Sequence, residues 1–217
     1  MFGPLALTLQ VAVLATLLAG LGALGVIALT HRRRAAGFVD AVLTAPLVLP
    51  PTVLGYYLLT ALGRRSALGE AFEAVTGSSF VFTRTGAVVA ACITAFPLIL
   101  QSARAAIDAV DGTLLDAART LGATRIGALR RVALPLASRG VASGLLLGFA
   151  RACGDFGVTL MLAGNIPGET QTASLALYDA MLAGRDGDAR TLAVSLTGLA
   201  VTSIILVQWL GRRPHVE

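Results

Sequence analysis

Long apolar runs separated by short polar segments make up most of the chain. Four windows carry no charged residue, and they are 5–30, 41–63, 85–103 and 191–211. A fifth apolar run, 140–164, is interrupted only by Arg151 and Asp155. Because a hydrocarbon core about 30 Å thick needs about 20 helical residues to cross it, each run is long enough to span a membrane.

The pattern therefore predicts one all-α polytopic membrane domain over residues 1–217, with about five spanning helices and six as the alternative count. Helices suit lipid because they satisfy their own backbone hydrogen bonds. The predicted spans are 5–30, 38–62, 85–103, 138–160 and 191–211. The first run holds 26 residues, which is too long for a signal-peptide core and typical of a retained membrane helix.

Composition supports the membrane interpretation. The chain is 56% hydrophobic and only 13% charged, whereas a soluble domain carries about 25% charged residues. The net charge of +5 comes from Arg, because the sequence contains no Lys. Such an excess is more typical of the cytoplasmic ends of membrane helices than of nucleic-acid binding. The two Cys and two His residues lie apart without ligand spacing, so we expect no metal site and no cofactor in this chain.

The distribution of Arg predicts the orientation. Eleven of the Arg residues fall in three segments, 31–34, 104–139 and 212–213, which five spans would place on one side. Five Arg fall on the other side. Since basic residues concentrate in the cytoplasm, we expect the loop 104–137 and the C-terminus there and the N-terminus outside.

The loop 104–137 carries an ordered polar motif. Thr113 and Asp116 have the spacing of a capping box, so a helix is expected from Thr113 to Leu121. Gly122 is expected to end that helix in a left-handed conformation. A second, basic helix is expected over 125–132, with a break near Pro135.

One face of the first loop helix is apolar, with Leu114, Leu115, Ala118 and Leu121 at helical spacing. Such a stripe can lie on the bilayer surface or fit a groove in another protein. The outer segment 165–190 is expected to contain a turn at 165–168 and a short helix at 173–183. That helix either packs on the bundle or forms a lip or docking surface over a pore.

The loop resembles the EAA loop of permease subunits of ABC importers, the inner-membrane components of binding-protein-dependent transport systems. The matching residues are Asp116, Ala117, Ala118, Gly122, Val132, Leu134 and Pro135. The departure is Asp116, because Glu is usual there. The resemblance implies that the loop is a coupling helix that sits in a cleft of a cytoplasmic ATPase. Its expected coupling residues are Leu114, Leu115, Asp116, Ala117, Ala118, Leu121, Gly122 and Pro135.

Two further stretches, 148–172 and 50–57, resemble molybdate permease subunits, with sulfate and tungstate permeases as the nearest relatives. Asp155 replaces a usual Glu in the first stretch. The resemblance implies the fold of a type I importer permease in the inner membrane. It also implies a second copy of the chain, a dimer of ATPase subunits that hold ATP and Mg²⁺, and an extracytoplasmic oxyanion-binding protein. The chain has no P-loop and no Lys, so it is not expected to hydrolyse ATP.

Arg151 and Asp155 lie four residues apart on one face of a predicted span. An ionisable group at the bilayer centre costs about 2.5–3.5 kcal/mol on insertion scales, so it usually faces protein or water. The pair is either an internal ion pair or part of an anion pathway, in which Asp155 holds Arg151 toward the dimer axis. In the second case Thr159 and Asn165 could add neutral donors for a tetrahedral oxyanion.

Two other classes of protein are weighed against an importer permease. A secondary transporter usually shows paired repeats and broken helices in both halves, and no repeat is visible here. A membrane scaffold would not need a charged pair inside a span. A secondary transporter would also leave the loop motif without a role.

Overall fold

The computed structural model describes residues 2–30 and 36–211. Predictions that involve Arg32–Arg34, Arg212 and Arg213 lie outside these residues. The described part is helical and contains no strand, which confirms the all-α expectation. Its α-helices are α1 (Phe2–Thr30), α2 (Ala36–Thr44), α3 (Pro51–Leu62), α4 (Ala67–Thr76), α5 (Arg84–Asp108), α6 (Gly112–Thr120), α7 (Arg125–Ala128), α8 (Leu134–Cys153), α9 (Gly157–Ala163), α10 (Ala173–Leu182) and α11 (Asp186–Gly211). A 3₁₀ turn, Ala45–Leu47, follows α2, and a π-helical segment, Leu129–Ala133, precedes α8.

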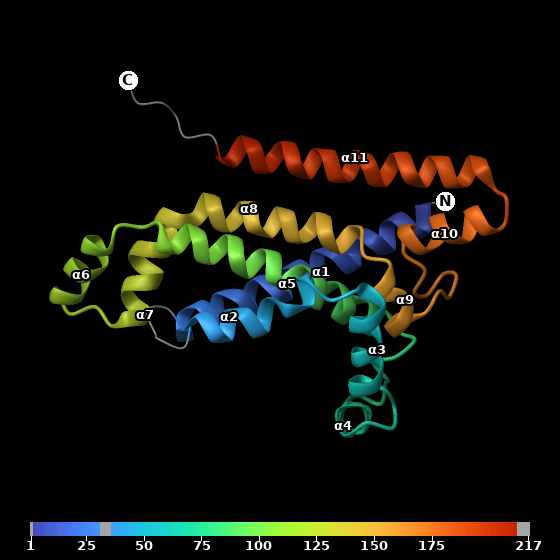
Figure 1. Ribbon diagram of the computed structural model, residues 1–217, viewed down its shortest axis with the longest axis horizontal. Coiled ribbons are helices and arrows are strands. Elements are labelled where there is room, and N and C mark those ends of the chain that lie inside the picture. The colour runs from blue at the N-terminus through green and yellow to red at the C-terminus, as the bar shows by residue number, and fades with distance from the viewer. Residues whose placement is uncertain (1, 31–35, 212–217) are drawn as a thin grey trace.

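Four long helices form an elongated bundle. Helices α1, α5 and α8 pack against one another, and α11 packs on α8 (Figure 1). Helices α6 and α7 lie at one end of the bundle, whereas α9 and α10 lie toward the other (Figure 1). The loop between α5 and α8 is therefore far from the segment that follows α8.

Small residues let the central helices approach closely. On α1, Ala12, Ala15, Ala19 and Ala23 share one face and are at most 1% exposed. On α8, Gly140, Gly144 and Gly148 face α5 at helical spacing. A Cβ atom added at Gly144 would come within 2.8 Å of Ser102 Cβ, so no larger residue fits there. Such small-residue contacts are typical of helix packing in membranes.

Four described helices are long and apolar enough to cross a membrane, and they are Gly3–Thr30, Arg84–Asp108, Arg125–Cys153 and Asp186–Leu210. The pair Gly37–Leu47 and Pro51–Leu62 would be a fifth span if it is counted as one, but it bends by 106° at the break. The expected span over 38–62 thus consists of two helices with a sharp bend between them. The reason is Pro50-Pro51, since Pro lacks an N–H donor and disfavours a helical residue before it.

The expected fourth span, 138–160, is also interrupted. Helix α8 ends at Cys153 and α9 begins at Gly157, and residues 154–156 form a non-helical break. Pro97, by contrast, lies inside α5 without ending it. The predicted outer turn and helix are present, with α10 spanning Ala173–Leu182.

Candidate functional site

Helix α6 begins at Gly112, and its N-cap lies two residues before the predicted cap, Thr113. Its N-cap is Asp111, whose Oδ1 accepts a hydrogen bond from the Thr113 amide at 2.9 Å. The backbone amide hydrogen bond from Thr113 lowers the pKa of Asp111. The capping box on Thr113 is therefore wrong, because the Asp111 carboxylate already satisfies the first turn. Asp116 lies one turn further on, with its carboxylate 3.8 Å from Arg119 Nη1.

Gly122 ends α6 as the sequence predicts. It has φ +88°, in the left-handed region. The amide of Gly122 donates to Arg119 O, and the amide of Ala123 donates to Ala118 O, at 3.0 Å each. These two bonds form a Schellman motif, which satisfies the last carbonyls of the helix. Hydrogen bonds within the loop thus define both ends of α6.

The apolar stripe of α6 divides into two parts. Leu115 is 5% exposed and Ala118 is partly buried, and both pack into the core cluster of the bundle. Leu121 is 89% exposed and Leu114 is 47% exposed. The buried pair holds α6 on the molecule, while Leu114 and Leu121 present an apolar surface to the outside.

The chain continues into α8 without the predicted break at Pro135. Thr124 caps α7 by accepting from the Gly127 amide at 3.1 Å. The π-helical segment 129–133 then leads directly into α8, with Pro135 in its first turn. Pro cannot donate the ordinary helical hydrogen bond, so a local widening of the helix takes the place of a break.

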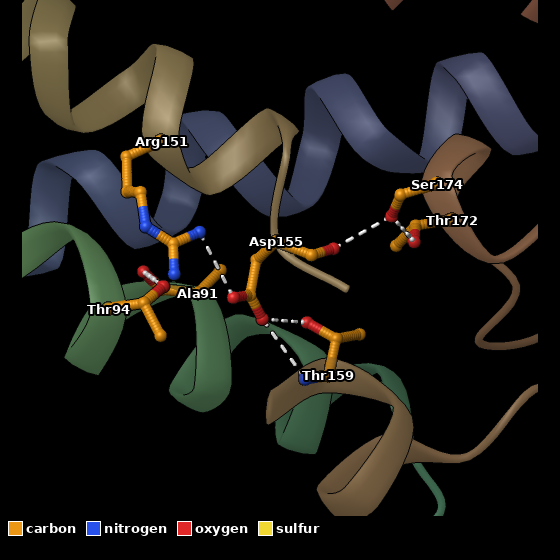
Figure 2. A network of polar contacts seen from close by, with 7 residues as sticks. All are labelled: Ala91, Thr94, Arg151, Asp155, Thr159, Thr172 and Ser174. Atoms are coloured by element: carbon orange, nitrogen blue, oxygen red, sulfur yellow. Dashed lines mark hydrogen bonds and ion pairs between the residues drawn. The ribbon is translucent and has the colours of Figure 1, made fainter. Parts of the chain in front are cut away.

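At the C-terminal end of α8, the non-helical segment 154–156 contains a buried carboxylate, that of Asp155. The Asp155 side chain is 1% exposed. Its Oδ2 accepts from the Thr159 amide at 3.0 Å and from the Thr159 hydroxyl at 2.6 Å. Its Oδ1 accepts from Arg151 Nη1 at 3.2 Å. Figure 2 shows the carboxylate lying between Arg151 on α8 and Thr159 on α9.

The three side chains of the site differ in how far they are engaged in hydrogen bonds and exposed. Asp155 is fully engaged, because its two oxygens accept three hydrogen bonds. Arg151 keeps 32% of its side chain exposed and donates a hydrogen bond, through Nη1, to Asp155. Thr159 is 1% exposed, and its hydroxyl proton points to Asp155. The hydroxyl is therefore not available to a ligand in this arrangement.

Asn165 lies apart from these three residues, beyond the C-terminal end of α9. Its Oδ1 is buried and has no hydrogen-bond partner among the described residues. Nearby, the Thr170 hydroxyl accepts from the Ile166 amide at 3.1 Å and shapes the turn. The structure thus brings Arg151, Asp155 and Thr159 together and leaves Asn165 separate.

The sequence does not predict a further ion pair, which is partly buried and lies at the end of the bundle near α6. Arg104 Nε lies 2.7 Å from Asp40 Oδ2, and Arg104 Nη2 donates to the Thr30 hydroxyl at 2.7 Å. The side chains of Arg104 and Asp40 are 13% and 24% exposed. The pair joins α2 to α5, and its members are too far apart in sequence for any local spacing to indicate it.

Comparison with known proteins identifies the family. Residues 12–215 match the family described as the binding-protein-dependent transport system inner membrane component. The chain belongs to this family. It is 43% identical over 176 residues to the molybdenum transport system permease protein ModB of Escherichia coli K12, covering 80% of this chain and 76% of that protein. It is 36% identical to the putative molybdenum transport system permease protein YvgM of Bacillus subtilis, covering 95% and 92% of the two chains.

Solved structures of the family's fold are also similar. An amino acid ABC transporter crystallised with histidines matches with a TM-score of 0.65 and 19% identity, covering 98% of this chain and 92% of that chain. A bacterial transporter that imports the polysaccharide alginate matches with a TM-score of 0.66 and 16% identity, covering 96% and 77%. At these identities the likeness establishes the fold of an ABC importer permease and leaves the substrate to other evidence.

Proposed function

We propose that this chain is the membrane permease subunit of an ATP-driven importer of molybdate. The observation that carries the proposal is its similarity, over most of its length, to permease proteins of molybdenum transport systems. The complex would contain a second copy of the permease, two ATPase subunits with ATP and Mg²⁺, and an extracytoplasmic binding protein. ATP hydrolysis belongs to the ATPase subunits.

The loop between α5 and α8 is the proposed contact with the ATPase. Its helix α6 is held on the bundle by Leu115 and offers Leu114 and Leu121 outward. An amphipathic helix of this kind suits a groove in another protein. ATP binding would draw the two ATPase subunits together and move α6 with them, so that the spanning helices open toward the binding protein.

The proposed orientation places α6 and α7 in the cytoplasm. These helices belong to the Arg-rich loop between α5 and α8. The C-terminal end of α11 lies toward the same end of the bundle (Figure 1). The N-terminal end of α1, with α9 and α10, lies toward the other end, outside the cell (Figure 1). The arrangement follows the excess of basic residues on the cytoplasmic side.

Arg151 is the proposed anion contact in the membrane. Molybdate is a tetrahedral dianion, and the forked donors of a guanidinium suit such oxyanions. Asp155 orients the guanidinium and offsets part of its charge, which favours release, because a pathway must bind its ion weakly. Thr159 acts here by holding Asp155, and Asn165 remains a candidate neutral donor.

The test is ATP-dependent uptake of labelled molybdate by the complex reconstituted in liposomes. Arg151→Ala is expected to lower uptake by about tenfold or more, corresponding to loss of a charge-assisted hydrogen bond of about 1.5–3 kcal/mol. Arg151→Lys, which keeps the charge and loses the fork, should retain part of the uptake. Wild-type uptake in both variants would remove Arg151 from the pathway. Competition by sulfate or tungstate stronger than by molybdate would reassign the substrate.

A further inference from the structure

The start of helix α10 contacts the break between α8 and α9. The Ser174 hydroxyl donates to the main-chain oxygen of Asp155 at 2.7 Å. One turn later, the ring of Tyr178 packs on the ring of Phe156, with centroids 5.1 Å apart. Residues 174 and 178 lie on one face of the helix. Two neighbouring residues of the break are thus held by one face of α10.

Helix α10 is itself fixed to the bundle. The Ala173 amide donates to the Thr8 hydroxyl of α1 at 2.8 Å. Ala173, Leu175 and Ala180 are fully buried, and the helix packs on both α1 and α11. Thr172 adds a hydroxyl 3.0 Å from Ser174 Oγ, on the side of Ser174 that does not face Asp155 (Figure 2). Ser174 therefore links the backbone of Asp155 to a helix that is itself firmly packed on the bundle.

The main chain of Asp155 determines where its carboxylate lies. That carboxylate accepts two hydrogen bonds from Thr159, so it has little freedom to rotate. It also receives Arg151 Nη1 at 3.2 Å. A shift of residues 154–156 would therefore either move the Arg151 nitrogen that pairs with Asp155 or separate the two side chains. The contacts form one chain from α10 through Asp155 to Arg151 (Figure 2).

We propose that Ser174 is a positioning residue for transport, which fixes Asp155 and thereby aims the Arg151 guanidinium at the anion. The inference rests on the proposed function, in which Arg151 meets the anion. Ser174 does not touch the anion itself. Its contribution is to hold the backbone between α8 and α9, and with it the Asp155 carboxylate that pairs with Arg151.

The first measurement compares Ser174→Ala with Ser203→Ala in the reconstituted complex. Ser203 is a matched control, because its buried hydroxyl donates to Leu199 O within its own helix α11. Ser174→Ala should lower molybdate uptake by about two- to tenfold, the range that loss of one hydrogen bond gives. Basal ATP hydrolysis and the amount of assembled complex should stay at the wild-type level in both variants.

The second measurement is a double-mutant cycle between Ser174→Ala and Arg151→Lys. If Ser174 acts through Arg151, Ser174→Ala should change uptake less than about twofold once Arg151 is Lys. A full additive loss in that background would overturn the inference, as would wild-type uptake in Ser174→Ala. If Arg151→Lys and Arg151→Ala both transport normally, the pathway assignment fails as well. The two failures are therefore distinguishable.

Discussion

Asp155 shows how one side chain can combine two structural tasks. Its carboxylate accepts the Thr159 amide, which satisfies a free donor in the first turn of α9, and it also pairs with Arg151. A buried carboxylate is costly unless its oxygens are hydrogen-bonded. With three donors on two oxygens, Asp155 meets that condition inside a helical membrane bundle.

Replacing Asp155 should separate these tasks. Asp155→Asn keeps an acceptor for the Thr159 amide but loses the ion pair, whereas Asp155→Ala loses both. Removing one partner of a buried pair costs about 3–5 kcal/mol, and partial exposure of Arg151 places the Ala variant near the low end of this range. Thermal unfolding in detergent should rank wild type above Asn and Asn above Ala. Equal stability of the two variants would mean that the hydrogen bond from the Thr159 amide to residue 155 contributes nothing to the stability of the fold.

The sequence predicts part of this site. Spacing alone predicts the contact between Arg151 and Asp155. It does not predict that the Thr159 hydroxyl turns inward to Asp155, because the run 140–164 is long enough for one continuous helix and gives no separate signal for a break at 154–156. The role of Ser174 depends on a contact between segments 19 residues apart, which no local pattern encodes.

At the scale of elements, the ends of α6 differ in how well they can be predicted. The sequence predicts the end of α6 correctly, because a Gly after an apolar helical stripe is a strong termination signal. It does not predict the start, since Asp and Thr are both good N-cap residues and only the structure shows that Asp111 is the cap. The sequence predicts a break near Pro135, whereas the structure has a π-helical segment that leads into α8. A Pro residue is compatible with both arrangements, so the sequence alone does not distinguish them.

The outward part of α6 should contribute to ATPase binding and little to folding. Leu121→Asp is expected to lower affinity for the ATPase subunit by about thirtyfold or more, the loss typical of a central apolar contact of at least 2 kcal/mol. Because Leu121 is 89% exposed, the unfolding temperature of the permease alone should not change.

The matched control is Leu182→Asp at the end of α10, where Leu182 is 71% exposed. It places the same charge on an exposed Leu at the other end of the bundle and should leave ATPase binding intact. Co-purification of tagged permease with the ATPase measures both variants. Equal retention of the ATPase by Leu121→Asp and wild type would contradict the coupling role of α6.

At the scale of the whole molecule, the apolar runs predict the long helices, and the Arg distribution predicts how they are oriented. The packing order of α1, α5, α8 and α11 is not readable in this way, because it depends on which small residues face each other. The bent pair α2 and α3 and the Arg104–Asp40 contact likewise arise only when distant segments meet.

Thiol labelling tests the orientation. The two native thiols, Cys92 and Cys153, are first replaced by Ala, and then Thr120→Cys in α6 and Gly187→Cys in α11 are made separately. Both positions are exposed. A membrane-impermeant maleimide should label Gly187→Cys in intact cells with a permeabilised outer membrane, and Thr120→Cys only after lysis. Labelling in the reverse order would invert the proposed topology.

The glycines of α8 have a mechanical consequence. Gly140, Gly144 and Gly148 bring α8 so close to α5 that even one added methyl group meets Ala106, Ser102 or Ile99. Contacts made mostly by backbone and short side chains have few alternative rotamers to absorb a displacement. Helices α5, α6 and α8 should therefore move together as one rigid body. A displacement at the α6 end of these helices should be passed with little loss to Arg151, near the other end of α8.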